Sequence, residues 1–280
     1  MKKIFLILLT SLAIQSYSQL PSYEYNFYAR IIPNEGVAVP NRYTGESQVK
    51  FSKRVHRVID SRMKQNKVLA WPRNPLNQIL WQAVTDGFPD LGKAKAYTSD
   101  SLSSTLTKAQ LKEKTTRKYK TWIPNPLNPN DPNDLVQVPV EDPLDVSTLV
   151  KFRIMEDWIF DAKYSDLRPR IIAIAPIYQR ISESGVDLGE HPLFWVKMDE
   201  LRPILAQQEI FNRRNDAARM SYDHWFSKRL FASHIVKESN VYDTDIAYQE
   251  AFRDDGVEAL LEGERIKNDL FVTEHDLWEY

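Results

Sequence analysis

Two stretches far apart in the chain carry the same pattern of residue types, and the fold has to place both copies. Residues 49–62 read VKFSKRVHRVIDSR, and residues 150–163 read VKFRIMEDWIFDAK. Both begin Val-Lys-Phe, and an offset of 101 residues aligns Asp60 with Asp161. The repeat indicates either an internal duplication or a chance likeness between two amphipathic segments.

Apolar residues recur every three or four positions in both copies, which predicts that each copy is a helix. Apolar, strand-like runs follow at 67–72 and 170–176, each ending in proline. Residues 95–106 and 194–205 then align at an offset of 99 and favour a further strand in each copy. The predicted fold class is therefore α+β, with two related helix-strand-insert-strand units followed by a mainly helical C-terminal region.

The two inserts predict different structures. In the first, Asn74 caps a helix that starts at Pro75 and ends at Gly87. Its apolar face consists of Leu76, Ile79, Leu80, Ala83 and Val84. In the second, Ser182-Glu183-Ser184-Gly185 indicates a turn between two strands of a long hairpin.

The remaining segments complete the predicted organisation. Six prolines in residues 121–146 exclude a helix and favour an extended linker. The C-terminal region begins with a predicted amphipathic helix at 206–231, followed by a strand at 233–239 and a helix at 245–268. The predicted domains are 1–18, a signal peptide; 19–45, an extended N-terminal arm; 46–120, the first unit; 121–148, the linker; 149–205, the second unit; and 206–280, the helical region with an acidic, aromatic tail.

The first residues are typical of an export signal. Lys2 and Lys3 precede an apolar run too short to span a bilayer, and a small-residue cleavage site predicts cutting between Ser18 and Gln19. No cysteine follows for lipidation. Loss of the two lysines changes the formal net charge from −1 to −3, which argues against nucleic acid as a partner. The mature protein is expected to be exported and not membrane-spanning.

The sequence contains few patterns that predict catalysis. It has 8 Gly, where average usage of about 7% would give roughly 20, so phosphate-cradling loops are not expected. No G-x-S-x-G, G-x-x-x-x-G-K-[ST], G-x-G-x-x-G or H-E-x-x-H motif occurs. The linker has no D-x-D-x-D-G loop for calcium. We therefore predict no catalytic residue, no metal and no cofactor.

Two arrangements keep a hydrolase open as an alternative. Asp223 next to His224 resembles acid–base machinery, although adjacent residues on a helix point about 100° apart. The repeated Asp60 and Asp161 could serve as paired carboxylates if they lay within roughly 5–9 Å of each other. We expect these aspartates to anchor their helices to nearby backbone or to another chain, and not to form local ion pairs with Arg62 and Lys163.

Aromatic and basic residues of the second half predict contacts with other proteins, because these residue types are enriched at interfaces. A buried strand is the alternative for the run at 193–196, and a third hypothesis is a ligand-binding module that stacks on Trp195. The candidate interface residues are Phe194, Trp195, Arg213, Arg214, Arg219, Trp225, Phe226, Lys228 and Arg229.

The second half also resembles a known family. RIIAIAP (170–176), PLFWV (192–196) and above all FNRRNDAARMSYDHWFSKRLFASHIVKESNVYD (211–243) are similar to the gliding motility protein N family (GldN/PorN) of the type IX secretion system. The resemblance implies a periplasmic structural component that forms a ring, itself oligomeric, with an outer-membrane lipoprotein (GldK/PorK), through which it associates with the outer membrane. It also implies contact with the periplasmic part of the inner-membrane motor protein (GldM/PorM). It implies no catalytic residues.

Overall fold

The repeated stretches are strands that pair with each other, not helices. The computed structural model of the protein describes residues 36–124, 135–182, 186–215, 217–253 and 255–278. In it, β1 (Val49–Asp60) and β5 (Lys151–Asp161) run antiparallel as neighbours in the main sheet. Val55 lies opposite Glu156, its own equivalent at the offset of 101, so the two copies are related by an approximate twofold axis. The predicted helices were wrong.

The physical reason is that both faces of these strands are partly buried. In β1, residues 55–59 are buried without interruption, so the apolar positions mimic helical spacing. A short buried strand cannot be distinguished from a buried helix by periodicity alone. The β-branched Val55, Val58 and Ile59 favour the strand.

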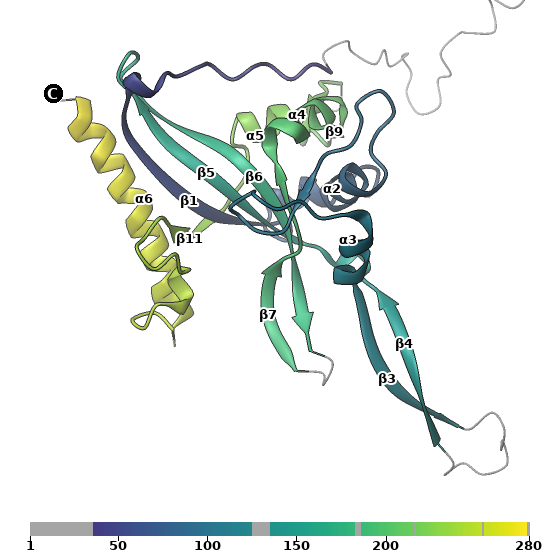
Figure 1. Cartoon of the computed structure of the whole chain (residues 1–280). Coiled ribbons are helices and arrows are strands. Elements are labelled where there is room, and N and C mark those ends of the chain that lie inside the picture. The colour runs from purple at the N-terminus through teal and green to yellow at the C-terminus, as the bar shows by residue number, and fades with distance from the viewer. Residues whose placement is uncertain (1–35, 125–134, 183–185, 216, 254, 279–280) are drawn as a thin grey trace, which may run out of the picture. The chain divides into compact units, whose positions relative to one another are not determined.

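The main sheet has the strand order β11-β1-β5-β6-β8-β2, and β7 also pairs with β6 (Figure 1). The central β6 is long enough for β7 and β8 to pair with successive parts of it. The aligned segments at 95–106 and 194–205 meet here too, because Ala96 and Tyr97 of β2 pair with Val196 and Trp195 of β8. The further strands are β2 (Ala96–Tyr97), β6 (Asp166–Ile181), β7 (Asp187–Pro192), β8 (Trp195–Lys197) and β11 (His234–Glu238).

The α+β class is confirmed, whereas two separate units are not seen. Residues 36–280 form one compact unit, in which equivalent segments of the two copies are neighbours in one sheet. The helices of the described part are α2 (Leu76–Thr85), α3 (Lys108–Thr115), α4 (Met198–Gln207), α5 (Tyr222–Ser227) and α6 (Gly256–Trp278), with 3-10 turns at Glu46–Gln48, Asn66–Ala70, Val146–Thr148 and Ile246–Tyr248.

The first insert folds as predicted. α2 buries Leu76, Ile79, Leu80, Ala83 and Val84. The chain leaves the helix at Gly87, whose φ of +78° favours glycine. One detail differs: Pro75 takes the cap position, and the Asn74 side chain instead donates to the Glu209 carbonyl at 2.9 Å.

Other sequence-based predictions were mixed. Residues 67–70 belong to the 3-10 turn Asn66–Ala70 instead of a strand, whereas 170–176 lie in β6 as expected. The strand continues past Pro176. The Pro176 carbonyl accepts the Leu193 N–H at 2.9 Å, at the junction of β7 and β8. The N–H that proline lacks would point to this same junction, so the proline is tolerated within β6. The predicted hairpin is confirmed by β6 and β7, although 183–185 lie outside the described residues.

The C-terminal region is less helical than predicted at its start. Residues 206–231 contain the short β9 (Glu209–Ile210) and β10 (Met220–Ser221) and the six-residue α5 instead of one helix. The strand at 233–239 is confirmed by β11. The last helix begins at Gly256 and includes most of the acidic, aromatic tail.

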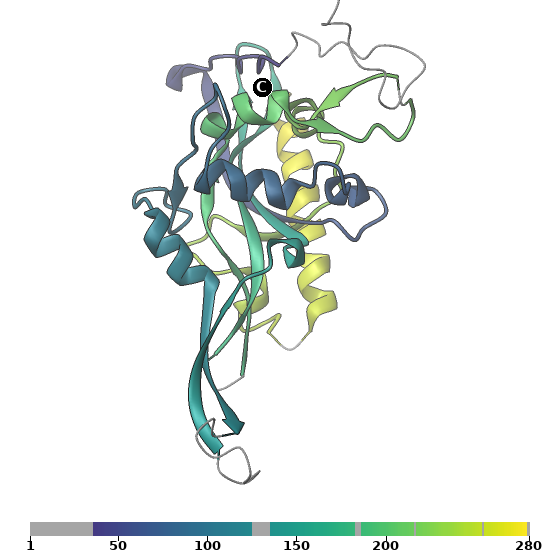
Figure 2. The same cartoon turned by 90° about the vertical axis from the view of Figure 1, so that its right-hand side faces the viewer.

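The linker forms a hairpin apart from the main sheet. Strands β3 (Thr116–Pro124) and β4 (Leu135–Pro143) pair antiparallel and extend away from α3 (Figure 2). The extended conformation was predicted, but pairing was not. Residues 36–45 of the predicted N-terminal arm have no regular helix or strand, and Arg42 from this arm forms an ion pair with Asp161 at 3.3 Å. Residues 1–35, which include the predicted signal peptide, lie outside the described residues.

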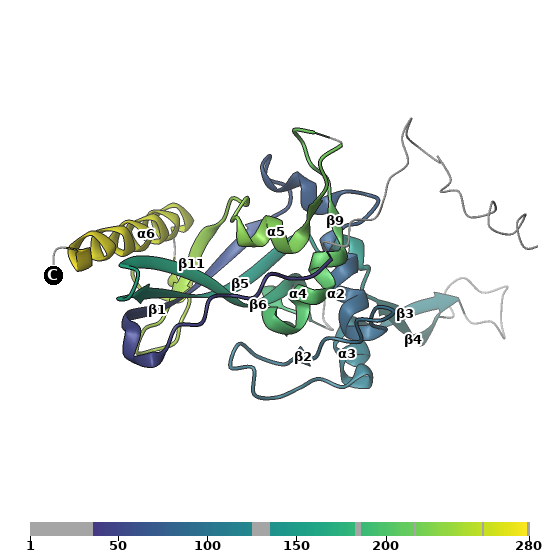
Figure 3. The ribbon, with the colours of Figure 1, turned by 90° about the horizontal axis from the view of Figure 1, so that it is seen from above.

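One face of β5 carries two apolar clusters with a charge between them. Phe152 and Ile154 belong to the large cluster, which α2, α4 and α5 cover. Trp158 and Phe160 belong to the small cluster, to which β11 of the same sheet contributes Ile235 and which α6 covers (Figure 3). Glu156 lies between them on the same face because side chains alternate along a strand. None of the helices in the described ranges has the length and apolar character to cross a bilayer.

Candidate functional site

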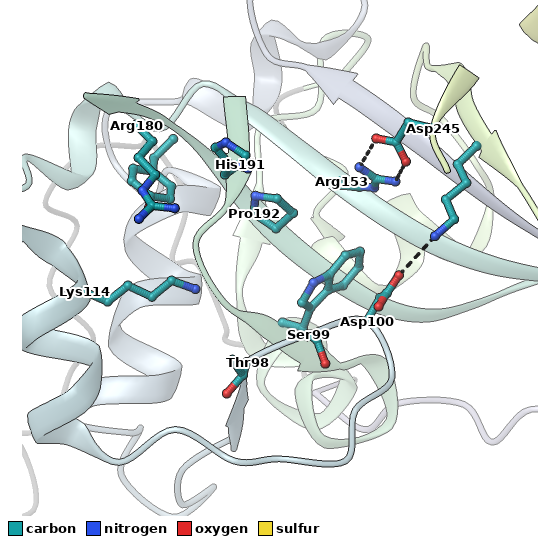
Figure 4. Close-up of a pocket in the computed structure, with 12 residues that line it drawn as sticks. Thr98, Ser99, Asp100, Lys114, Arg153, Arg180, His191, Pro192 and Asp245 are labelled. Atoms are coloured by element: carbon teal, nitrogen blue, oxygen red, sulfur yellow. Dashed lines mark hydrogen bonds and ion pairs between the residues drawn. The ribbon is translucent and has the colours of Figure 1, made fainter. Parts of the chain in front are cut away.

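A charged pocket opens where β7 gives way to β8 along the edge of β6. Its volume is about 350 Å³. Strands β5, β6, β7, β8 and β11 of the main sheet, the loop after β2, the end of α3 and the segment after β11 all contribute to its wall (Figure 4). The lining residues are Thr98, Ser99, Asp100, Lys114, Arg153, Tyr178, Arg180, His191, Pro192, Trp195, Lys237 and Asp245.

Two of the four cations in the wall are held by carboxylates. Arg153 and Asp245 form a bidentate pair, with Nη1 2.7 Å from Oδ2 and Nη2 2.5 Å from Oδ1. Lys237, which is 7% exposed, lies 2.6 Å from Asp243 and 3.5 Å from Asp100. This side of the pocket is therefore neutralised by the chain itself.

His56 of β1 lies behind these ion pairs. It is buried, its Nδ1 accepts a hydrogen bond from Arg153 Nε at 3.3 Å, and its ring meets Trp195 edge-on at 5.8 Å. Burial, followed by the charges of Arg153 and Lys237, lowers the pKa of His56 to about 3. The imidazole is therefore neutral at neutral pH and forms part of the pocket's support.

The other two cations, Lys114 and Arg180, have no carboxylate within ion-pair distance among the described residues. Lys114 ends α3, and Arg180 projects from β6 on the same side of the pocket (Figure 4). Burial and the charge of Arg180 both lower the pKa of Lys114. The pocket wall thus has two cations in excess over its two carboxylates, and both lie on one side.

The arrangement is suited to binding an anion. The hydroxyls of Thr98 and Ser99 belong to the same pocket wall and can donate hydrogen bonds. Ser99 Oγ lies 2.8 Å from Ser101 Oγ. In the described part of the chain, no histidine–carboxylate pair is hydrogen-bonded to the Ser99 hydroxyl to activate it as a nucleophile. No cluster of three or more His, Cys, Asp or Glu residues there could hold a metal ion.

The predicted acid–base pair points in two directions. Asp223 is buried and accepts hydrogen bonds from Arg202 Nε at 2.7 Å and Nη2 at 3.1 Å. His224 is exposed on the other side of α5. The carboxylate therefore holds α5 to α4 and does not orient the imidazole.

The repeated aspartates lie at opposite ends of the β1–β5 pair. Val49 pairs with Asp161, and Asp60 follows Val49 by eleven residues along β1. At about 3.3 Å per residue the carboxylates are roughly 35 Å apart, far beyond the separation of paired glycosidase carboxylates. This contradicts the hydrolase hypothesis in its paired-carboxylate form.

Each aspartate instead caps the turn after its strand. Asp60 Oδ1 accepts the N–H of Arg62 at 2.9 Å, and Asp161 Oδ1 accepts the N–H of Lys163 at 3.0 Å. The predicted anchoring to nearby backbone is thus present in both copies. The expectation that Asp60 and Arg62 form no ion pair was wrong, because their side chains approach to 2.6 Å where the chain turns.

The four aromatic candidates for an interface are core residues. Phe194, Trp225 and Phe226 belong to the large cluster, and Trp195 is 3% exposed against Ala173, Ala175 and Tyr97. Their side chains offer almost no surface to a partner. All four residues of the run 193–196 are buried, as the alternative expected, but only Trp195 and Val196 belong to a strand. Trp195 does line the pocket, although the wall is mainly charged instead of aromatic.

The basic candidates differ among themselves. Arg229 pairs internally with Glu156 at 2.8 and 3.1 Å, and Arg219 is half-buried. Arg213 and Arg214 are exposed in the loop between β9 and β10, and Lys228 is exposed after α5. A partner contact through these three remains a prediction.

Sequence reasoning missed the pocket residues. Lys114 and Arg180 belong to different predicted units, and nothing in the sequence around either indicates that they meet. The sequence offered only weak signs of this pocket, namely the Lys-Glu-Lys run at 112–114 and a basic residue, Arg180, near the predicted hairpin turn.

The fold and the pocket define an α+β protein with one main sheet and a pocket lined mainly by charged residues. The chain belongs to the gliding motility associated protein GldN family, whose model matches residues 44–279. It is thus a gliding-motility-associated protein. No individual curated protein matches it significantly.

Proposed function

We propose that this protein is an exported structural component of the type IX secretion and gliding machinery. It resides in the periplasm and assembles with further copies of itself and a GldK/PorK-like lipoprotein into a ring at the outer membrane. It also contacts the periplasmic part of a GldM/PorM-like motor protein. The observation that carries the proposal is the match to the GldN family over residues 44–279.

Features of the chain support a role in assembly. The N-terminal residues have the pattern of an export signal without a lipidation cysteine, so the anchor would come from the lipoprotein. Exposed apolar side chains occur on α6, where Val257, Leu261 and Val272 are more than half exposed. Such side chains are available for contact with another chain.

The test is co-expression with the lipoprotein of the same secretion system, followed by gel filtration and electron microscopy. We expect large, ring-shaped assemblies that contain both proteins. Fractionation of cells should place the protein with the outer membrane only when the lipoprotein is present. A strictly monomeric protein that does not bind the lipoprotein would rule the proposal out.

A further inference from the structure

Lys114 and Arg180 lie on one side of the pocket, and no carboxylate of the described residues lies within ion-pair distance of either (Figure 4). Lys114 is half-buried, so its ammonium has lost part of its hydration. Holding two like charges near one another costs free energy, which an anion between them would recover. By contrast, Arg153 and Lys237 in the same wall each form an ion pair with a carboxylate.

Exposed apolar side chains lie next to these cations on the β6–β7 hairpin. Val186 and Leu188 are 59% and 47% exposed, whereas Ile181 points to the face opposite Arg180 because side chains alternate along β6. The hairpin places Leu188 beside the pocket, because the pocket residue His191 bonds through Nε2 to the Leu188 carbonyl at 3.0 Å. A basic pocket and an apolar strip therefore adjoin.

We propose that this pocket and the adjoining strip bind an acidic peptide segment of another protein. One or two carboxylates of the segment would lie between Lys114 and Arg180, with the Ser99 hydroxyl as a further donor. Aliphatic side chains of the same segment would cover Val186 and Leu188. The proposal deepens the proposed function, on which it rests only in assuming that the chain contacts other proteins.

Two observations favour a protein segment over a free oxyanion. A small ion would fill only part of a 350 Å³ pocket and would leave the apolar strip in water. The excess of positive charge is also local, since the mature chain as a whole is weakly acidic. Such local complementarity selects a partner by charge and fixes its register.

The test selects peptides from a random library displayed on phage against the purified full-length mature protein. We expect enriched peptides to carry Asp or Glu next to aliphatic residues. The affinity of a synthetic representative, measured by calorimetry, should fall at least tenfold in the Lys114→Gln/Arg180→Gln double variant. Its Gln-for-Glu and Asn-for-Asp analogue should lose binding to the wild-type protein to a similar extent.

Matched controls separate the pocket from general charge. The Lys112→Gln/Lys118→Gln double variant removes the same charge from exposed positions on α3 and β3 and should bind as the wild type does. Inorganic phosphate serves as the small-ion probe. Enrichment without acidic residues, unchanged affinity in the pocket variant, or binding of phosphate with no peptide selected would overturn the proposal. Because the assay uses the isolated chain, its failure is distinguishable from failure to form rings.

Discussion

The two ends of the inward face of β5 show how differently one strand can be used. At the Phe152 end, the large cluster is enclosed by α2, α4 and α5. At the Phe160 end, the small cluster is covered mainly by α6, whose outer side leaves Val257, Leu261 and Val272 exposed. Side chains alternate in the same way at both ends of β5. The two ends differ in the helices that pack on them: α2, α4 and α5 at one end and α6 at the other.

Arg229 joins the two ends. Its guanidinium pairs with Glu156, which is fully buried, and lies 5.1 Å from the ring of Phe231 in the large cluster and 5.8 Å from that of Trp158 in the small one. The large cluster is therefore the larger and more enclosed part of the core, whereas the small cluster is a thinner layer connected to it through an ion pair.

The largest effect is expected in the large cluster. Leu80→Ala removes a fully buried side chain of α2 from the large cluster, so the free energy of unfolding should fall by about 3–5 kcal/mol. Chemical denaturation monitored by circular dichroism measures this loss. A loss below about 1 kcal/mol would show that the large cluster can rearrange and is not the stable part.

The junction should come next. Arg229→Ala leaves the buried Glu156 without its bidentate partner, and we expect a loss of about 2–4 kcal/mol, because Arg57 nearby still attracts the carboxylate. The Glu156→Leu/Arg229→Met double variant removes both charges and should recover most of the stability. If the single and double variants were equally unstable, the Glu156–Arg229 ion pair would not be the main source of stability where the two clusters meet.

A smaller, local effect is expected in the small cluster. A Cβ added at Gly263 of α6 would lie 2.7 Å from the carbonyl oxygen of Ile235 in β11, so Gly263→Ala should push the helix off the sheet and cost about 1–3 kcal/mol. Hydrogen exchange should become faster in α6 and β11 but not in α2. Gly256→Ala is the matched control, because its Cβ would meet no atom within 4 Å. Equal effects of the two substitutions would contradict the close approach.

The smallest effect concerns the opposite face of the sheet, where His56 faces Arg153, Lys237, Asp245, Arg54 and Asp100. Its pKa of about 3 lies below the value near 6.5 in the unfolded chain, so below pH 6.5 the unfolded state binds more protons. Stability contributed by neutral His56 is therefore complete above pH 6.5 and falls progressively towards pH 3. Between pH 6.5 and 5 the loss should be on the order of 1–2 kcal/mol.

Thermal unfolding at several pH values checks this expectation. His56→Gln should flatten the decrease in stability over that pH range. An unchanged slope in the variant would assign the pH dependence to the carboxylates and not to this imidazole.

The sequence predicts those elements whose determinants are local. The buried face of α2 and the turn at Gly87 depend on spacing and on one glycine, and both were correct. The strands β1 and β5 were missed because burial on both faces conceals the alternation in β1. In β5, Phe152, Ile154, Trp158 and Phe160 do alternate, but Glu156 interrupts the apolar series, and its partner Arg229 follows 73 residues later.

The candidate site depends on long-range pairing to a greater degree. Lys114 and Arg180 meet only because α3 ends beside the β6–β7 hairpin, and no spacing rule relates residues brought together in this way. The interface candidates show the same limit. Aromatic side chains at 194, 195, 225 and 226 serve cores and interfaces equally well, and only the tertiary structure shows that they are buried.

The pairing of β1 with its own repeat gives the molecule an internal replicate. Asp60 and Asp161 make the same bond to the N–H two residues on, at opposite ends of one ladder. Asp161 is buried under Arg42 and Thr44, whereas Asp60 binds the exposed Arg62. The same substitution made at each position would thus measure one hydrogen bond in two surroundings, with strand type, turn and chain held constant.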